Sequence, residues 1–316
     1  MNFMFLFLVA HFVSKLKKDT INTMFLKLVQ ITQIGAIIGI VKFLTGLSSS
    51  ANFIPMMNRN GTAFWMVLAS IILCYAREKS MISKQNFIVT NIVFLVCIIF
   101  IGSRMGIIGY FMGQYFYTIF YSNKKRNTIS KKRTAFIFSI ILGICLLFSP
   151  LGGTVVSRFS DLGVLYKAMK ANESNLYQLR SYKRIVYLQQ GLELIKAHFW
   201  FGTGPGLHNY LKGKEKLNLP FKGKSHNFFI SYFAELGLIG FSLLMCLMLH
   251  LHHIFKKNGI QEERKLFLSI WMIVMIMSLF NEYFFQVYIW IIWGIGCGLS
   301  LKYYKEKASA NKLQPG

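Results

Sequence analysis

Acidic residues are scarce in this chain of 316 residues, which has 11 Asp and Glu against 36 Lys and Arg. The two aspartates, Asp19 and Asp161, lie far apart in sequence, so a paired-aspartate metal site or a phosphoaspartate motif is hard to build. Nucleotide motifs are also missing. Residues 223–225 read Gly-Lys-Ser, but Asn218 stands where a phosphate-binding loop needs its first glycine, and residues 202–207 lack the last glycine of a dinucleotide fingerprint. These absences argue against ATP-driven and NAD-driven functions.

Cysteine is present, but not in a pattern that stabilises a fold. None of the five lies in a loop where it could pair with another or ligate zinc, because all of them fall inside apolar runs: Cys74, Cys97, Cys145, Cys246 and Cys297. Disulfides and a structural metal are therefore not expected. A cleavable signal is not expected either, because the apolar stretch 1–13 has no basic region before it.

Apolar runs recur along the whole chain. Hydrophobic residues make up 54% of it and charged residues 15%, which is typical of an integral membrane protein. The net charge of +25 falls in blocks between the apolar runs, without the aromatic and basic interleaving of a nucleic-acid-binding face. We expect an all-α, polytopic membrane helix bundle of about nine spans, near residues 2–14, 28–47, 62–76, 87–102, 105–121, 134–149, 227–255, 266–282 and 287–301.

The basic connectors predict the orientation of these spans. If the spans alternate in direction, five basic connectors fall on one side, and the positive-inside tendency makes that side cytoplasmic. This arrangement predicts four regions. They are N-terminal transmembrane helices at 1–149, an extracytoplasmic or periplasmic loop at 150–225, C-terminal transmembrane helices at 226–301 and a cytoplasmic tail at 302–316.

The long external loop is basic, with 12 Lys and Arg against 4 Asp and Glu over residues 150–225. Long loops are free to break the positive-inside trend, so this charge suits an anionic ligand. For any single lysine of the loop, the simplest interpretation is a solvated side chain near lipid headgroups.

Within the loop, Leu188, Leu192, Ile195 and Phe199 recur at helical spacing and predict one apolar stripe on an amphipathic helix. Arg180 and Arg184 continue that stripe by steps of four toward the start of the helix, which would aim both guanidinium groups at one spot. We expect the helix to end at the glycine-rich turn 202–206.

Three further side chains are candidates for chemistry. Arg104 interrupts an apolar region, and an arginine at membrane depth is a functional candidate, although it could simply extend its guanidinium to the headgroups. His226 lies where the loop enters a span and could accept a proton from a sugar hydroxyl, or could serve only as a cap. Glu235 lies nine residues farther on, so a regular helix would turn it away from His226 and place it about 13 Å deeper, as a structural partner first and a catalytic group second.

These residues resemble the O-antigen ligase and oligosaccharide repeat-unit polymerase superfamily of bacterial envelopes. The family pattern is an Arg, an amphipathic stretch, Gly-x-Gly-x-Gly, a spacer, His-Asn and a Glu-Leu-Gly helix. It is matched by Arg184, by Gly202, Gly204 and Gly206, by His226 and Asn227, and by Glu235 to Gly240. Upstream, Asn58 to Gly61 is similar to the family's Asn-x-Asn element and Gly102 to Gly106 to its Ser-Arg-x-Gly element. Phe199 departs from the pattern by replacing the usual proline of a His-Pro pair, and Leu188 stands where tryptophan is common.

The resemblance implies a GT-C-like membrane glycosyltransferase, inverting and metal-independent, with no cofactor. Its donor would be a glycan on undecaprenyl pyrophosphate, and its acceptor another glycan or a lipid core. Arg104, Arg180 and Arg184 would bind the pyrophosphate with support from Arg59, and His226 would orient or deprotonate the acceptor hydroxyl. Asn227, Gly202, Gly204, Gly206 and Glu235 would support the site, which would lie on the outer face of the plasma membrane.

Two further points stay open at the level of sequence. The family includes polymerases of O-antigen, capsule and exopolysaccharide as well as ligases that complete lipopolysaccharide, and the divergent composition of this chain favours a polymerase. The competing class is a transporter or flippase for an anionic lipid-linked saccharide, which usually shows internal repeats of span groups that this chain lacks. A membrane scaffold without chemistry is a third option, and partners from polysaccharide assembly are compatible with each of these functions.

Overall fold

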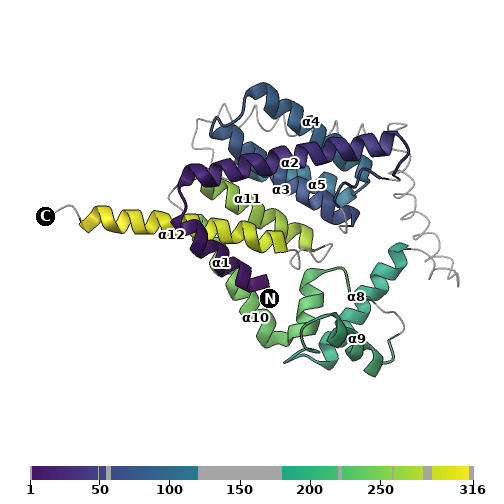
Figure 1. The fold of residues 1–316 in the computed structure, drawn as a ribbon. Coiled ribbons are helices and arrows are strands. Elements are labelled where there is room, and N and C mark those ends of the chain that lie inside the picture. Colours follow the sequence, from purple (N-terminus) through teal and green to yellow (C-terminus); the bar gives the residue numbers. More distant parts are fainter. Residues whose placement is uncertain are drawn as a thin grey trace. The chain divides into compact units, whose positions relative to one another are not determined.

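A computed structural model describes residues 2–48, 50–54, 58–119, 180–219, 223–257, 260–279 and 287–312. The described residues form helices and connecting turns, without strands, which confirms the predicted all-α class. The chain divides into two compact units (Figure 1). The first contains α1 to α5, most of α11 and α12; the second contains α8, α9 and most of α10.

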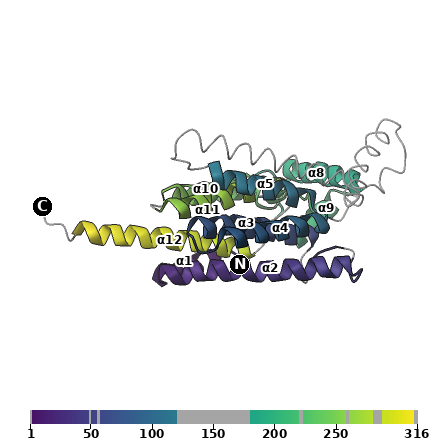
Figure 2. The ribbon, with the colours of Figure 1, turned by 90° about the horizontal axis from the view of Figure 1, so that it is seen from above.

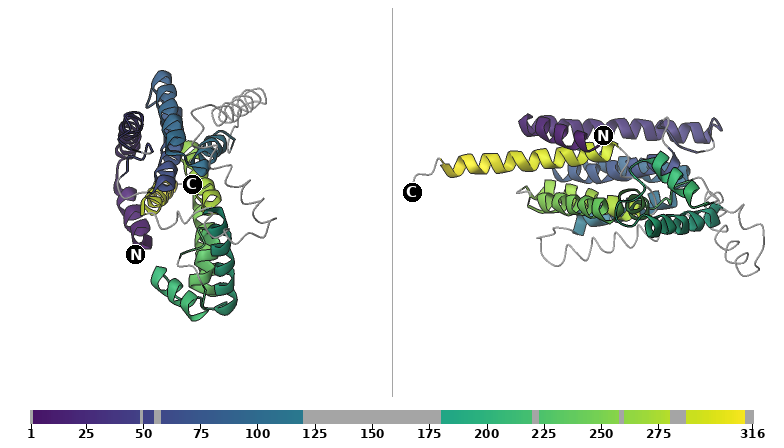
Figure 3. Two further views of the ribbon diagram at one scale, coloured as in Figure 1. Left: turned by 90° about the vertical axis from the view of Figure 1, so that its right-hand side faces the viewer. Right: turned by 90° about the horizontal axis from the view of Figure 1, so that it is seen from below.

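The first unit is a bundle of long apolar helices. Figure 2 shows the axes of α2, α3 and α4 running in similar directions, and both views of Figure 3 show α1 beside α12. Close approach of α1 and α12 depends on glycine, because a Cβ at Gly298 would lie 2.7 Å from the carbonyl oxygen of Ala10. The helices of this unit are α1 (Asn2–Lys15), α2 (Lys18–Leu44), α3 (Arg59–Glu78), α4 (Lys84–Ile101), α5 (Arg104–Ile119), α11 (Gln261–Ser278) and α12 (Val287–Lys312).

Three of the described helices are long and apolar enough to cross a membrane: α2, α4 and α10 (Phe228–Lys257). A shorter apolar helix covers Leu6–Lys15. The spans predicted near 62–76, 87–102 and 105–121 correspond to α3, α4 and α5 with small shifts of their ends, whereas α2 begins ten residues before the predicted span at 28–47. The earlier start has a physical reason, since residues 18–27 are polar enough to escape a hydropathy search but contain no helix breaker. The span predicted at 134–149 lies outside the described residues.

Ion pairs join several helix ends of the first unit. Lys18 at the start of α2 meets Glu263 at 2.9 Å, and Lys79 after α3 meets Glu262 at 3.1 Å. Lys265 pairs with Glu78 at the end of α3. These contacts bring the basic connectors around residues 18, 79 and 265 to the same end of the unit, as expected for connectors that share one side of a membrane.

The second unit is built from α8 (Arg180–Ala197), α9 (Leu207–Lys216) and the first part of α10. Its small core contains Leu194, Tyr210 and Ala234, one from each helix. α8 approaches α10 closely, because a Cβ at Gly191 would lie 2.5 Å from the side chain of Ile230. Figure 1 shows α10 bending sharply, and the break is at Gly237, whose φ of 65° and ψ of −175° are not helical.

Candidate functional site

The α8 helix exists where the sequence predicts it, and within its unit it is buried on one side. It ends at Ala197, and the residues buried in its unit are Gln190, Gly191 and Leu194. Of the predicted apolar stripe, Leu192 is 46% exposed and Phe199 is 41% exposed. Within its unit α8 therefore packs through Gly191 and Leu194, with Ile195 of the stripe partly buried against the same core. The role of the exposed stripe residues stays a prediction.

The glycine-rich turn and the break in α10 interlock through their backbones. The amide of Thr203 donates to the carbonyl of Ala234 at 2.8 Å, and the amide of Gly204 donates to the carbonyl of Glu235 at 3.0 Å. In the other direction, the amide of Leu238 donates to the carbonyl of Phe199 at 2.7 Å. The opened helix thus pairs with the turn instead of leaving its backbone groups unsatisfied.

Both ends of this interlock require glycine. Gly202 has φ +68° and Gly237 has φ +65°. A Cβ on Gly202 would lie 2.3 Å from the carbonyl oxygen of Glu235, and a Cβ on Gly237 would lie 2.3 Å from the carbonyl oxygen of Trp200. The Gly-x-Gly-x-Gly and Glu-Leu-Gly elements, separate in sequence, are therefore two halves of one structural feature.

Glu235 holds the loop from inside this feature. Its side chain is 3% exposed and its carboxylate pairs with Lys224, two residues before His226. The same carboxylate accepts the amide proton of Gly206 at 2.8 Å. Within its unit Glu235 is thus a partner of loop groups, which the fold of residues 223–227 brings to the carboxylate, and its expected depth in the membrane stays a prediction.

Lys214 of α9 is a second buried cation, which contradicts the simple expectation of solvated loop lysines. Lys214 is only 2% exposed. Its ammonium group donates to the side-chain oxygen of Gln190 and to the carbonyl of Gly223, each at 2.6 Å. The ammonium also lies 5.2 Å from the ring centroid of Tyr187. Burial lowers the pKa of Lys214 from 10.5 to about 8.

His226 is exposed at the end of the segment that these lysines hold. Its backbone has φ +54°, unusual for a residue other than glycine, and its ring meets that of Tyr187 edge to face at 5.9 Å between centroids. Asn227 follows as the cap of α10, with its side-chain oxygen accepting the amide of Ile230 at 3.1 Å. The segment from Gly223 to Asn227 thus presents the imidazole from a fixed backbone.

The two upstream motif elements meet in the first unit. The side chain of Asn58 caps α3 by accepting the amide of Gly61 at 2.7 Å. The hydroxyl of Ser103 donates to the side-chain oxygen of Asn60 at 3.0 Å and accepts the amide of Gly106 at 3.1 Å, which caps α5. Arg59 and Arg104 are therefore the first residues of two neighbouring helices. The position of Gly106 has no room for a side chain, since a Cβ there would lie 2.6 Å from the Cβ of Ala63.

Each unit therefore assembles its own share of the predicted site. The second unit gathers the three turn glycines, Glu235, Asn227 and His226, and it carries Arg180 and Arg184 on the first turns of α8. The first unit pairs the helix starts at Arg59 and Arg104. The side chains of Arg104, Arg180 and Arg184 lie outside the described part of the structure, and their convergence with His226 stays a prediction.

Sequence reasoning missed Lys214 and Lys224 as organising residues. A signal existed for Lys214, since Tyr210, Gly213 and Lys214 share one face of a short helix at spacings of three and four. Lys224 had no comparable signal, because its partner Glu235 lies eleven residues away across a turn.

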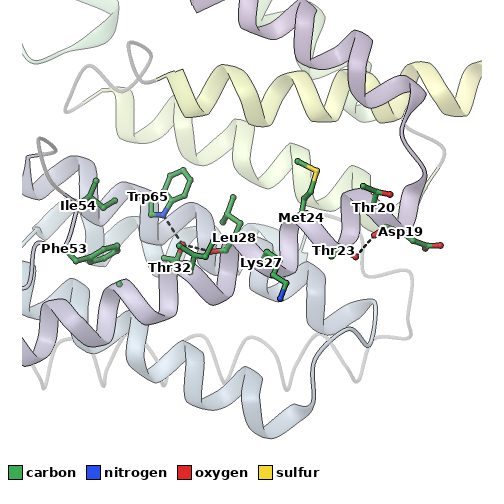
Figure 4. A pocket seen from close by; sticks show the side chains of 12 residues that line it. Asp19, Thr20, Thr23, Met24, Lys27, Leu28, Thr32, Phe53, Ile54 and Trp65 are labelled. Carbon is green, nitrogen blue, oxygen red and sulfur yellow. Dashed lines mark hydrogen bonds between the residues drawn. The ribbon is translucent and has the colours of Figure 1, made fainter.

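A wide groove in the first unit is separate from these residues. It has a volume of about 980 Å³ and follows α2 from Asp19 to Gly35, closing against Phe53 and Trp65 (Figure 4). The indole of Trp65 donates to the hydroxyl of Thr32 at 3.1 Å, which joins α3 to α2 at this place. Its lining contains none of the predicted site residues.

No group of three or more His, Cys, Asp or Glu side chains within the described ranges is arranged to hold a metal ion. The chain shows no significant match to a curated protein. Residues 89–245 match the family model described as O-Antigen ligase, and this stretch includes Arg104, α8, the interlocked glycines, His226 and Glu235. The predicted resemblance is thereby confirmed, since this match supports the O-antigen ligase and repeat-unit polymerase superfamily.

Proposed function

We propose that this chain transfers a glycan from undecaprenyl pyrophosphate to an acceptor hydroxyl at the outer face of the plasma membrane. The observation that carries the proposal is the interlock between the glycine-rich turn and the broken α10, which fixes the segment bearing His226. Family membership supports a ligase or polymerase activity on lipid-linked glycans in a membrane. The rest of the mechanism is our inference from the chemistry of the site residues.

In this mechanism the acceptor oxygen attacks the anomeric carbon while the bond from that carbon to the phosphate oxygen breaks. The pyrophosphate leaves with the electron pair, and His226 takes the proton of the acceptor hydroxyl. Arg104, Arg180 and Arg184, with Arg59 in support, meet the charge that develops on the leaving group, since guanidinium groups bind phosphate bidentately and stay charged. A single displacement inverts the anomeric carbon, and the proposed arginines supply the charge stabilisation without requiring a metal ion.

We place this site in a GT-C-like bundle of about nine spans. Its basic connectors and the tail from residue 302 would face the cytoplasm. The ion-paired end of the first unit would lie on that side, because it gathers the basic connectors. We favour a polymerase of O-antigen, capsule or exopolysaccharide repeat units over a ligase, given the divergent composition of the chain.

The experiment that tests the proposal uses the full chain in proteoliposomes with lipid-linked repeat units and no energy source. Longer lipid-linked glycans are the expected product. Transbilayer movement of the lipid without a new glycosidic bond would instead support the competing transporter. In cells, a deletion strain that makes only single-unit glycans indicates a polymerase, whereas lipid-linked polymer left unattached indicates a ligase.

A further inference from the structure

A polar cavity lies in the α8–α9 unit on a different set of residues from the proposed catalytic groups. It has a volume of about 250 Å³. One wall is formed by residues of α9 that recur three and four positions apart and so share one face of the helix. The other wall is formed by the residue after the end of α8 and by the glycine-rich turn. Its lining residues are His198, Gly202, Thr203, Asn209, Lys212, Gly213 and Lys216.

The charge of this lining has one sign. Lys212 and Lys216 contribute two ammonium groups from consecutive turns of α9, His198 adds an imidazole, and no lining residue is acidic. The exposed pair of Glu193 and Lys196 on α8 shows that carboxylates are present in this unit but are not part of the cavity wall. A small basic cavity of this kind favours an anion.

One residue of the lining carries a polar group with no partner among the described residues. The hydroxyl oxygen of Thr203 is enclosed and forms no hydrogen bond among the described residues. An enclosed hydroxyl without a partner is costly, and an occupant that accepts its proton would remove the cost. The side-chain amide of Asn209 donates one proton to the carbonyl of Pro205 at 3.1 Å, which holds the turn in place beside the cavity.

We propose that this cavity binds a small anion of phosphate chemistry, held by Lys212 and Lys216, with His198 and the hydroxyl of Thr203 as further donors. Lysine serves as a point-charge ligand for phosphate. The volume suits one or two phosphate groups but is small for an oligosaccharide. The lining has no Phe, Tyr or Trp ring on which a sugar would stack. This inference does not depend on the proposed glycan transfer.

Site-resolved acylation of lysines tests the proposal on the full chain in phosphatidylcholine nanodiscs. Inorganic diphosphate is titrated against sodium chloride of equal ionic strength, and mass spectrometry reads the acylation rate of each lysine. We expect Lys212 and Lys216 to be protected severalfold, and Lys256 and Lys257, exposed in the last turn of α10, to be unaffected. The local readout separates this site from any diphosphate bound by the arginines.

A matched variant makes the test specific. Thr203→Val keeps the methyl group that packs near Gly213 but removes the hydroxyl, and should raise the half-protecting diphosphate concentration about tenfold. Repeating the measurement in phosphatidylglycerol nanodiscs without diphosphate identifies the source, because protection there indicates a lipid headgroup. Unchanged acylation in both arms, equal protection of Lys256 and Lys257, or protection by glucuronate but not diphosphate would overturn the proposal.

Discussion

The two units use positive charge in opposite ways. In the first unit, Lys18, Lys79 and Lys265 each meet a glutamate from another helix, so their charge is neutralised where helix ends join. In the second unit, Lys214 is held by neutral oxygens, and Lys212 and Lys216 line a cavity without carboxylates. Among the described residues of that unit, Lys224 alone has a buried carboxylate partner. The first unit thus uses positive charge to join helices, whereas the second unit keeps positive charge available for an anion.

The largest loss of stability in the second unit should come from Gly237→Ala. A Cβ there would meet three backbone atoms, the carbonyl oxygen and carbon of Trp200 and the amide nitrogen of Gly202, while φ is +65°. We expect a loss of about 4 kcal/mol or more in the free energy of unfolding, at the far end of single-residue effects. Thermal unfolding of the purified chain measures it.

Gly46→Ala is the control for that change, because Gly46 has φ +73° but open space around its Cβ. It should cost only about 1 to 2 kcal/mol from backbone strain. Equal melting temperatures for the two variants would show that the interlock of residues 199–206 with 234–239 is not a source of stability.

A smaller effect should follow from Lys224→Met, which leaves the carboxylate of Glu235 buried without a cation. Breaking a buried pair typically costs about 3 to 5 kcal/mol. In the first unit, Lys79→Met removes a half-exposed pair, with side chains 24% and 32% exposed, and should cost about 1 kcal/mol or less. The comparison of the two units would fail if both variants melted at the same temperature.

The smallest predicted effect is a pH dependence from Lys214. Folding lowers its pKa from 10.5 to about 8, so between these values the unfolded chain binds more protons than the folded chain. The free energy of unfolding should therefore gain a contribution that rises with pH through this window. Melting temperatures measured from about pH 8 to about pH 10.5 would detect it. Lys214→Met should remove this rise, and an identical pH profile for the variant would rule out Lys214 as its source.

The sequence predicts the elements better than their faces. Asn58 and Gly102 mark helix ends well, and the apolar runs locate α3, α4 and α5 to within a few residues. The close approach of α8 to α10 at Gly191 was not predictable, because periodicity reports where apolar residues recur and not which side a glycine lets approach. The break at Gly237 was also missed, since Glu-Leu-Gly-Leu-Ile-Gly reads locally as a continuous helix and only the distant partner turn stabilises its opening.

The candidate site follows the same rule. The motif residues Gly202, Gly204, Gly206, Glu235 and His226 were identifiable because their types and spacing match a family pattern. Lys214 and Lys224 belong to no such pattern. Lys214 had only the weak signal of a shared face with Tyr210 and Gly213, and Lys224 is recognisable only from the tertiary contact with Glu235.

The central claim is that the imidazole of His226 takes the proton of the acceptor hydroxyl, while the guanidinium groups of the arginines stabilise the leaving pyrophosphate. The most direct measurement is glycan transfer by purified protein from lipid-linked repeat units, comparing the parent chain with His226→Ala and Arg184→Lys. We predict that both variants keep the parent's melting temperature and lose roughly a hundredfold or more in rate. Transfer by His226→Ala at the parent's rate would contradict the claim.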